Sequence, residues 1–207
     1  MPSSSVSRPG AALLAAVLAL SGCSSVRTDS GRGISVHTQG AAVPAVKEAG
    51  EKEAYEKGVR AFEDIPVAEL LRRLEKGWSG TLFFGFADCP WCRAVLPAII
   101  RAAGRTGQDV CYVRVRDSEG KLLYTETQRR QLAGAIGGYM KKNDREGGKL
   151  WLYVPLVVSV RDGKAVKGHT GTLEGHDPSR ARLSRKQEEK LTDILVETMR
   201  PYPAAAD

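Results

Sequence analysis

The chain has 207 residues, of which 42% are hydrophobic and 27% are charged, proportions that are ordinary for a soluble globular protein and give no function by themselves. After the N-terminal segments are set aside, about 150 residues are left for a folded core, which is enough for one domain and excludes a second of ordinary size. The formal charge of +7 is spread over mixed clusters without interleaved aromatic residues, which excludes a typical nucleic-acid site.

The first 22 residues have the features of a secretory signal peptide. Arg8 supplies a positive start, and residues 11–20 form an apolar run that is too short to span a bilayer. Residues 20–23 read Leu-Ser-Gly-Cys and resemble the lipobox of bacterial lipoproteins. That resemblance implies a lipid on Cys23 and an extracytoplasmic protein anchored to a bacterial membrane; the alternative is a plain secretory signal with an incidental Cys23. Either signal places the mature chain where disulfides persist.

The next segment is expected to be a flexible tether that covers residues 23–57. Residues 24–46 are rich in Ser, Gly, Thr and Ala and have no sustained period. The charged stretch at 47–60 is compatible with a short helix. We therefore expect the folded domain to span residues 58–200 and residues 201–207 to form a tail.

The domain is predicted to open with a strand, a helix and a second strand. The first strand is expected at residues 59–62. Pro66 marks the start of the helix and Gly77 its end, and the apolar face at 3.6-residue spacing consists of Val67, Leu70, Leu71 and Leu74. Residues 81–87 are apolar on both faces, as in a central strand that helices cover on both sides.

Two cysteines that are two residues apart, Cys89 and Cys92, follow this strand at the predicted start of another helix. Pro90 suits the first helical position, so Cys89 falls at the N-cap and Cys92 one turn into the helix. The Cys89 sulfur then faces the unpaired N–H groups and the positive end of the helix dipole, which favour a thiolate over a thiol. Pro97 is expected to kink this helix.

The rest of the domain is predicted to alternate between helices and strands. The expected elements are the helix that ends near residue 104, a strand at 110–115, a turn at 117–120, a helix at 126–142, a strand at 151–160, a tight hairpin turn at 161–164 and a final helix from 184. Ser184 and Gln187 form a capping box for the final helix, which Pro201 stops. Glycines weaken the helix at 126–142.

The strand, the Cys-Pro-Trp-Cys sequence, the helix with its proline and a later Val154-Pro155 at the start of an apolar strand together resemble the thioredoxin superfamily. The resemblance implies a thioredoxin-like α/β fold, a central mixed sheet flanked by helices, with a helical insertion before the proline strand. It implies that Pro155 is the superfamily's cis-proline and that the Val154 backbone pairs with an extended substrate; an ordinary trans proline is the alternative. Thioredoxins carry a buried acid where this chain has Phe83, so no proton acceptor for Cys92 is carried over.

The resemblance also implies a function, that of a thiol–disulfide oxidoreductase. Cys89 and Cys92 are then the catalytic residues, and Trp91, Val154 and Pro155 contact the substrate. The chemistry needs no cofactor; the expected partners are protein thiols or disulfides and an unidentified redox partner, and the protein is expected to be a monomer. The general likeness is to bacterial thioredoxin-like lipoproteins and bacteriocin-transport accessory proteins. The residues between the cysteines leave open whether the protein reduces or oxidises its substrates.

Two other functions are kept as alternatives. One is a non-enzymatic module that holds an extended chain in a groove between Trp91 and Pro155. The other is a copper-handling protein that binds Cu(I) through Cys89, Cys92 and a histidine.

No metal site is predicted from the remaining candidate ligands. No second cysteine pair or Cys-His pair completes a zinc site, and the four neighbouring residues His169, Glu174, His176 and Asp177 are interpreted as a polar loop. Cys111 lies in a strand-like run and is expected to be a buried, inert thiol, with a role as an extra resolving cysteine as the alternative.

Overall fold

The computed structural model describes residues 42–200 of the chain. The predicted signal peptide, Cys23, the first part of the predicted tether and the tail at 201–207 lie outside the described residues. Among the helices of the described part, none is both long and apolar enough to cross a bilayer.

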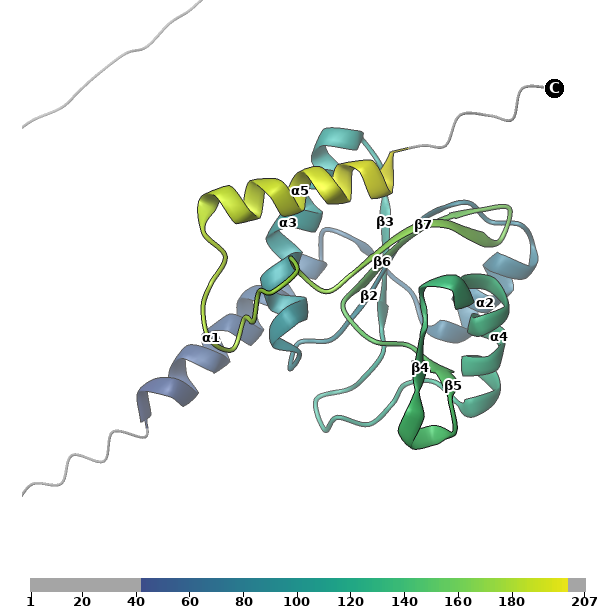
Figure 1. Ribbon diagram of the computed structural model, residues 1–207, viewed down its shortest axis with the longest axis horizontal. Helices are drawn as coiled ribbons and strands as arrows, with labels where there is room; N and C mark the ends of the chain where they lie inside the picture. The colour runs from purple at the N-terminus through teal and green to yellow at the C-terminus, as the bar shows by residue number, and fades with distance from the viewer. Residues whose placement is uncertain (1–41, 201–207) are drawn as a thin grey trace, which may run out of the picture. The chain divides into compact units, whose positions relative to one another are not determined.

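A five-stranded mixed sheet forms the centre of this part of the chain (Figure 1). Its strands, in spatial order, are β1 (Glu63–Asp64), β3 (Val110–Arg114), β2 (Gly80–Gly85), β6 (Leu156–Arg161) and β7 (Lys164–Thr170). The strand β2 pairs parallel with β3 on one side and antiparallel with β6 on the other, so it lies in the middle of the sheet. The predicted central strand is thereby confirmed, although it ends at Gly85 and not at residue 87.

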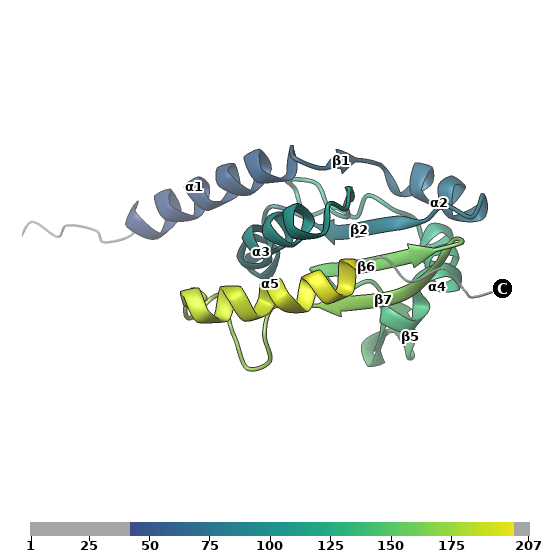
Figure 2. The same ribbon diagram turned by 90° about the horizontal axis from the view of Figure 1, so that it is seen from above.

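Helices cover both faces of the sheet (Figures 1 and 2). One face carries α1 (Ala42–Val59), α3 (Pro90–Thr106) and α5 (Arg185–Met199), and the other carries α2 (Val67–Glu75) and α4 (Glu126–Ile136). Because successive side chains of a strand point to opposite faces, Phe83 packs with the first group of helices and Phe84 with the second. The fold is therefore of the α/β class that the sequence predicts, with a central mixed sheet flanked by helices.

The folded domain begins earlier than residue 58. The helix α1 occupies the second half of the predicted tether, and its residues Tyr55 and Val59 are only 2% and 4% exposed. The predicted strand at 59–62 is wrong, because the chain turns there: the N–H of Phe62 donates to the carbonyl of Val59. The first strand is instead the two-residue β1, which pairs parallel with β3.

The segment before β6 contains the predicted helical insertion, but that helix is shorter than predicted. The helix α4 ends at Ile136, where a glycine pair takes over, and the predicted end at residue 142 is wrong. The segment that follows contains η1 (Gly137–Tyr139), β4 (Lys141–Asn143), η2 (Asp144–Glu146) and β5 (Lys149–Trp151). The strands β4 and β5 form a small antiparallel sheet, so the predicted strand at 151–160 is split and β6 starts only after Pro155.

The start of α5, the end of α3 and the hairpin turn have clear local causes. Ser184 and Gln187 form the reciprocal capping box that begins α5. In the turn between β6 and β7, Asp162 and Gly163 have φ of 47° and 74°, the left-handed backbone that an Asp-Gly pair favours in tight hairpins. The helix α3 continues through Pro97 as far as Thr106 and ends at Gly107, whose φ is 65°, rather than near residue 104.

Candidate active site

The two cysteines of the motif lie where β2 leads into α3. Cys89 is the N-cap of α3 with an extended backbone (φ −84°, ψ 111°), and Pro90 is the first helical residue. The Sγ of Cys89 accepts a hydrogen bond from the backbone N–H of Cys92 at 3.2 Å. The helix start therefore points an otherwise unpaired N–H group at the sulfur, as the sequence predicts.

The two thiols differ strongly in their tendency to ionise. Both cysteines are free and buried, with Cys89 7% exposed and Cys92 0% exposed. A hydrogen bond from the Cys92 thiol, the backbone N–H groups of Cys92 and Trp91 and the charge of Arg93 lower the pKa of Cys89. Burial raises the pKa of Cys92 well above its ordinary value. The pair therefore favours a thiolate on Cys89 and keeps the proton on Cys92.

The segment before β6 completes the site. The Val154–Pro155 peptide bond is cis, and the Cys89 thiol donates to the carbonyl oxygen of Val154 across 3.9 Å. Trp91 and Tyr153 are 38% and 44% exposed, so both aromatic side chains are open to solvent. The structure thus brings Cys89, Cys92 and the Val154–Pro155 segment together, with Trp91 beside the two thiols on the first turn of α3.

Charged residues of α1 flank the motif, which the sequence did not reveal. Lys52 forms an ion pair with Asp88, the residue before Cys89. Glu51 lies 3.6 Å from Nε of Arg93, the residue after Cys92. Lys52, Tyr55 and Val59 are three and four residues apart and therefore lie on one face of α1. This spacing is the signal in the sequence that could have shown that the short helix expected at 47–60 packs against the domain.

Aromatic residues occupy the place where a buried acid is expected from the resemblance. Phe83 is fully buried, and none of the buried polar side chains in the described part of the chain is a carboxylate. The Tyr55 hydroxyl donates to the Tyr112 hydroxyl at 3.2 Å, which donates to the carbonyl of Gly85 at 3.3 Å. Burial raises the pKa of Tyr112 to about 12, so this hydroxyl stays protonated at neutral pH and offers no base for Cys92.

Cys111 lies on the other face of the sheet from the motif. It is 4% exposed and packs with α2 and α4, whereas Cys89 and Cys92 pack with α1, α3 and α5. Its thiol donates to a carboxylate oxygen of Glu63 at 3.2 Å, and burial raises its pKa to about 12. The expectation that Cys111 is buried is confirmed, and the raised pKa is consistent with an inert thiol.

The histidines near residue 170 belong to a hydrogen-bonded loop. The ring of His169 donates to the carbonyl of Thr172 at 2.9 Å, and His176 bonds the Thr172 hydroxyl at 2.9 Å and the Ala181 carbonyl at 3.0 Å. Within residues 42–200, no group of three or more His, Cys, Asp or Glu side chains is close enough to hold a metal ion. These contacts support the interpretation of this segment as a polar loop.

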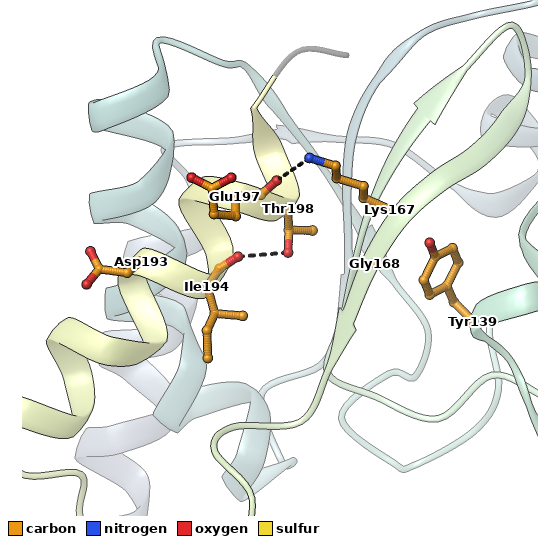
Figure 3. A pocket seen from close by; sticks show the side chains of 7 residues that line it. All are labelled: Tyr139, Lys167, Gly168, Asp193, Ile194, Glu197 and Thr198. Carbon is orange, nitrogen blue, oxygen red and sulfur yellow. Dashed lines mark hydrogen bonds between the residues drawn. The ribbon is translucent and has the colours of Figure 1, made fainter.

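A wide, open hollow of about 540 Å³ lies between β7, η1 and α5 (Figure 3). Its charged groups already have partners: the Lys167 ammonium donates to the carbonyl of Glu197, and the Asp193 carboxylate pairs with Arg105. None of the five residues predicted to react with or contact the substrate lines it. This hollow is therefore separate from the buried thiol pair.

Comparison with known proteins adds little to this description. No family model matches the chain, and no curated protein matches it. Among solved structures, oxidized mitochondrial thioredoxin 3 from Saccharomyces cerevisiae is similar at 13% identity and a TM-score of 0.33, over 66% of this chain and 98% of that chain. Likeness at this level says nothing about activity, so the fold class rests on the observed sheet order and helix layers.

Proposed function

We propose that this protein is a thiol–disulfide oxidoreductase that exchanges disulfides with protein substrates through Cys89 and Cys92. The observation that carries the proposal is the asymmetry of the pair: an N–H group of α3 donates to the Cys89 sulfur at 3.2 Å, while Cys92 is fully buried behind it. A nucleophilic thiolate and a protected resolving thiol are the two groups that such exchange needs.

In the reducing direction, the Cys89 thiolate attacks one sulfur of a substrate disulfide. The substrate S–S bond breaks, a mixed disulfide forms, and one substrate sulfur leaves as a thiolate. Cys92 then gives up its proton to that thiolate or to water and attacks the Cys89 sulfur, which releases the second substrate thiolate. The substrate gains two electrons and the Cys89–Cys92 pair loses two; oxidation of a substrate dithiol is the reverse sequence.

The backbone next to Cys89 supports a role in holding the substrate. The carbonyl oxygen of Val154 is 3.9 Å from the Cys89 sulfur. An extended substrate segment that pairs with this backbone brings its own sulfur close to Cys89. Trp91, which is 38% exposed, and Pro155 contact the segment on either side of the thiol.

The reduction potential of the pair tests the proposed function. We expect the chain from Ser24 onward, equilibrated in glutathione buffers, to form a reversible Cys89–Cys92 disulfide with a single two-electron transition, which the fluorescence of Trp91 and a thiol label report. A potential near about −270 mV indicates a reductase, and one near about −120 mV indicates an oxidase. A pair that forms no reversible disulfide contradicts the proposal, and copper bound to the purified protein would then support the copper-handling alternative.

We further propose that a lipid on Cys23 anchors the protein outside the cytoplasm. The Leu-Ser-Gly-Cys sequence that ends at Cys23 supports this proposal. In bacterial cells, replacement of Cys23 by alanine is expected to remove the lipid and to move most of the protein from the membrane fraction to the soluble extracytoplasmic fraction. The measurement is incorporation of labelled palmitate together with cell fractionation. Replacement of the neighbouring Ser24 by alanine is the control, and an unlabelled wild-type chain contradicts the anchor.

A further inference from the structure

The helix α1 is tightly fixed against the helix that carries the cysteines. Tyr55 and Val59 are buried between α1, α3 and the sheet, and the Tyr55 hydroxyl is held by Tyr112. Gly58 lies so close to α3 that a Cβ added there would be 2.8 Å from a methyl group of Leu96. The residues one turn before Tyr55 therefore have a fixed position relative to the motif.

That position places an ion pair on each residue that flanks the motif, Asp88 before Cys89 and Arg93 after Cys92. The ammonium group of Lys52 pairs with the carboxylate of Asp88, and their side chains are 36% and 37% exposed. Lys52 also lies 3.5 Å from Glu48 of its own helix. The hydrogen bond to Asp88 raises the pKa of Lys52, so Lys52 stays charged at neutral pH.

The other pair joins the same helix to the residue after Cys92. Glu51 lies 3.6 Å from Arg93 and 2.8 Å from Arg182, which comes from the loop before α5. A guanidinium nitrogen of Arg93 donates to the carbonyl of Ala87 at 2.8 Å. Arg93 is thus fixed between α1 and the turn that leads to Cys89, and its positive charge favours the Cys89 thiolate.

We propose that Lys52 is a positioning residue for the thiol chemistry, because it neutralises and holds the Asp88 carboxylate and thereby keeps the Cys89 thiolate stable. The inference rests on the proposed function and adds a residue that adjusts the stability of the Cys89 thiolate. The physical reason is the sign of the charges: an unpaired carboxylate beside Cys89 repels a thiolate, whereas the Lys52–Asp88 pair has no net charge. The charged groups around the motif are then Asp88, Arg93 and the α1 residues Glu48, Glu51 and Lys52, with Arg182 on Glu51.

A double-mutant cycle on Lys52 and Asp88 tests the proposal. We expect Lys52→Gln to raise the pKa of Cys89 by about half a unit to one unit, which lowers the thiolate fraction below that pKa about threefold to tenfold; the shift stays modest because solvent screens both side chains. Asp88→Asn is expected to lower the pKa of Cys89, and the double variant to return it close to the wild-type value. The measurement is the rate of iodoacetamide alkylation of Cys89 as a function of pH, with mass spectrometry to locate the label.

Lys57→Gln is the matched control, since Lys57 is an exposed lysine of the same helix. It should leave the alkylation profile unchanged. The proposal is overturned if Lys52→Gln leaves the pH profile at the wild-type position, or if Asp88→Asn does not cancel its effect. Circular dichroism of each variant checks that α1 is still folded.

Glutathione equilibration gives a second readout. Two glutathione thiols reduce the Cys89–Cys92 disulfide to the dithiol and leave one glutathione disulfide. A higher Cys89 pKa destabilises the reduced form, so Lys52→Gln should make the pair more reducing; a tenfold change in the equilibrium constant corresponds to about 30 mV. The two readouts are independent, because alkylation needs no exchange partner. A wild-type protein that forms no reversible disulfide contradicts only the proposed function. A Lys52→Gln variant with an unshifted alkylation profile overturns only the role of Lys52.

Discussion

Replacement of Cys92 by alanine is expected to convert the protein into a trap for its substrates. The Cys89 thiolate of this variant still attacks a substrate disulfide, but no second thiol is present to release the mixed disulfide. Cys92 is fully buried, and alanine leaves no unpaired polar group in its place. We expect substrate proteins linked to Cys89 to accumulate in cells and to be visible as high-mass bands on non-reducing gels.

Replacement of Cys89 by alanine should remove both the trapped species and the exchange reaction. The loss is expected to be about a thousandfold or more, because the nucleophile itself is gone. Cys111→Ala is the matched control, since Cys111 lies on the other face of the sheet and should leave trapping unchanged in a Cys92→Ala background. Near-normal function of Cys89→Ala in the cell would instead favour the non-enzymatic binding module.

The sequence predicts the motif and its immediate surroundings well because their causes are local. A proline at the first position of a helix, a cysteine before it and an apolar strand ahead of it are enough to predict the N-cap position of Cys89. The capping box at Ser184 and the Asp-Gly turn at 162–163 are local in the same way. Each depends on backbone geometry that a few neighbouring residues determine.

The contribution of α1 was missed because its cause is tertiary. Seven of its 18 residues are charged, and the apolar contacts that fix it are few and widely spaced along the sequence. Lys52 and Asp88 are 36 positions apart, and nothing in the sequence indicates that they form a pair. The same holds for the hydroxyl pair of Tyr55 and Tyr112, which meets only after α1 packs against the sheet.

Phe83 connects this tertiary arrangement to the thiols, and its replacement by alanine should strongly destabilise the fold. Its ring lies 5.5 Å from the centre of the Tyr112 ring and 6.4 Å from those of Tyr55 and Phe62. Removal of a fully buried phenylalanine leaves a cavity, and we expect the free energy of unfolding to fall by about 3–5 kcal/mol. Urea denaturation, followed by circular dichroism, measures the loss as a lower midpoint.

The neighbouring Phe84 separates a loss of stability from an effect on the site. Both side chains are fully buried, but Phe84 packs with α2 and α4 on the other face of the sheet. Phe84→Ala should therefore be destabilised by a similar amount and keep the wild-type alkylation profile of Cys89. Phe83→Ala should also shift that profile, because Tyr55 loses its support and α1 then holds Lys52 less firmly against Asp88. Equal shifts in the two variants would mean that the thiol responds to general loosening of the core and not to the α1 contact.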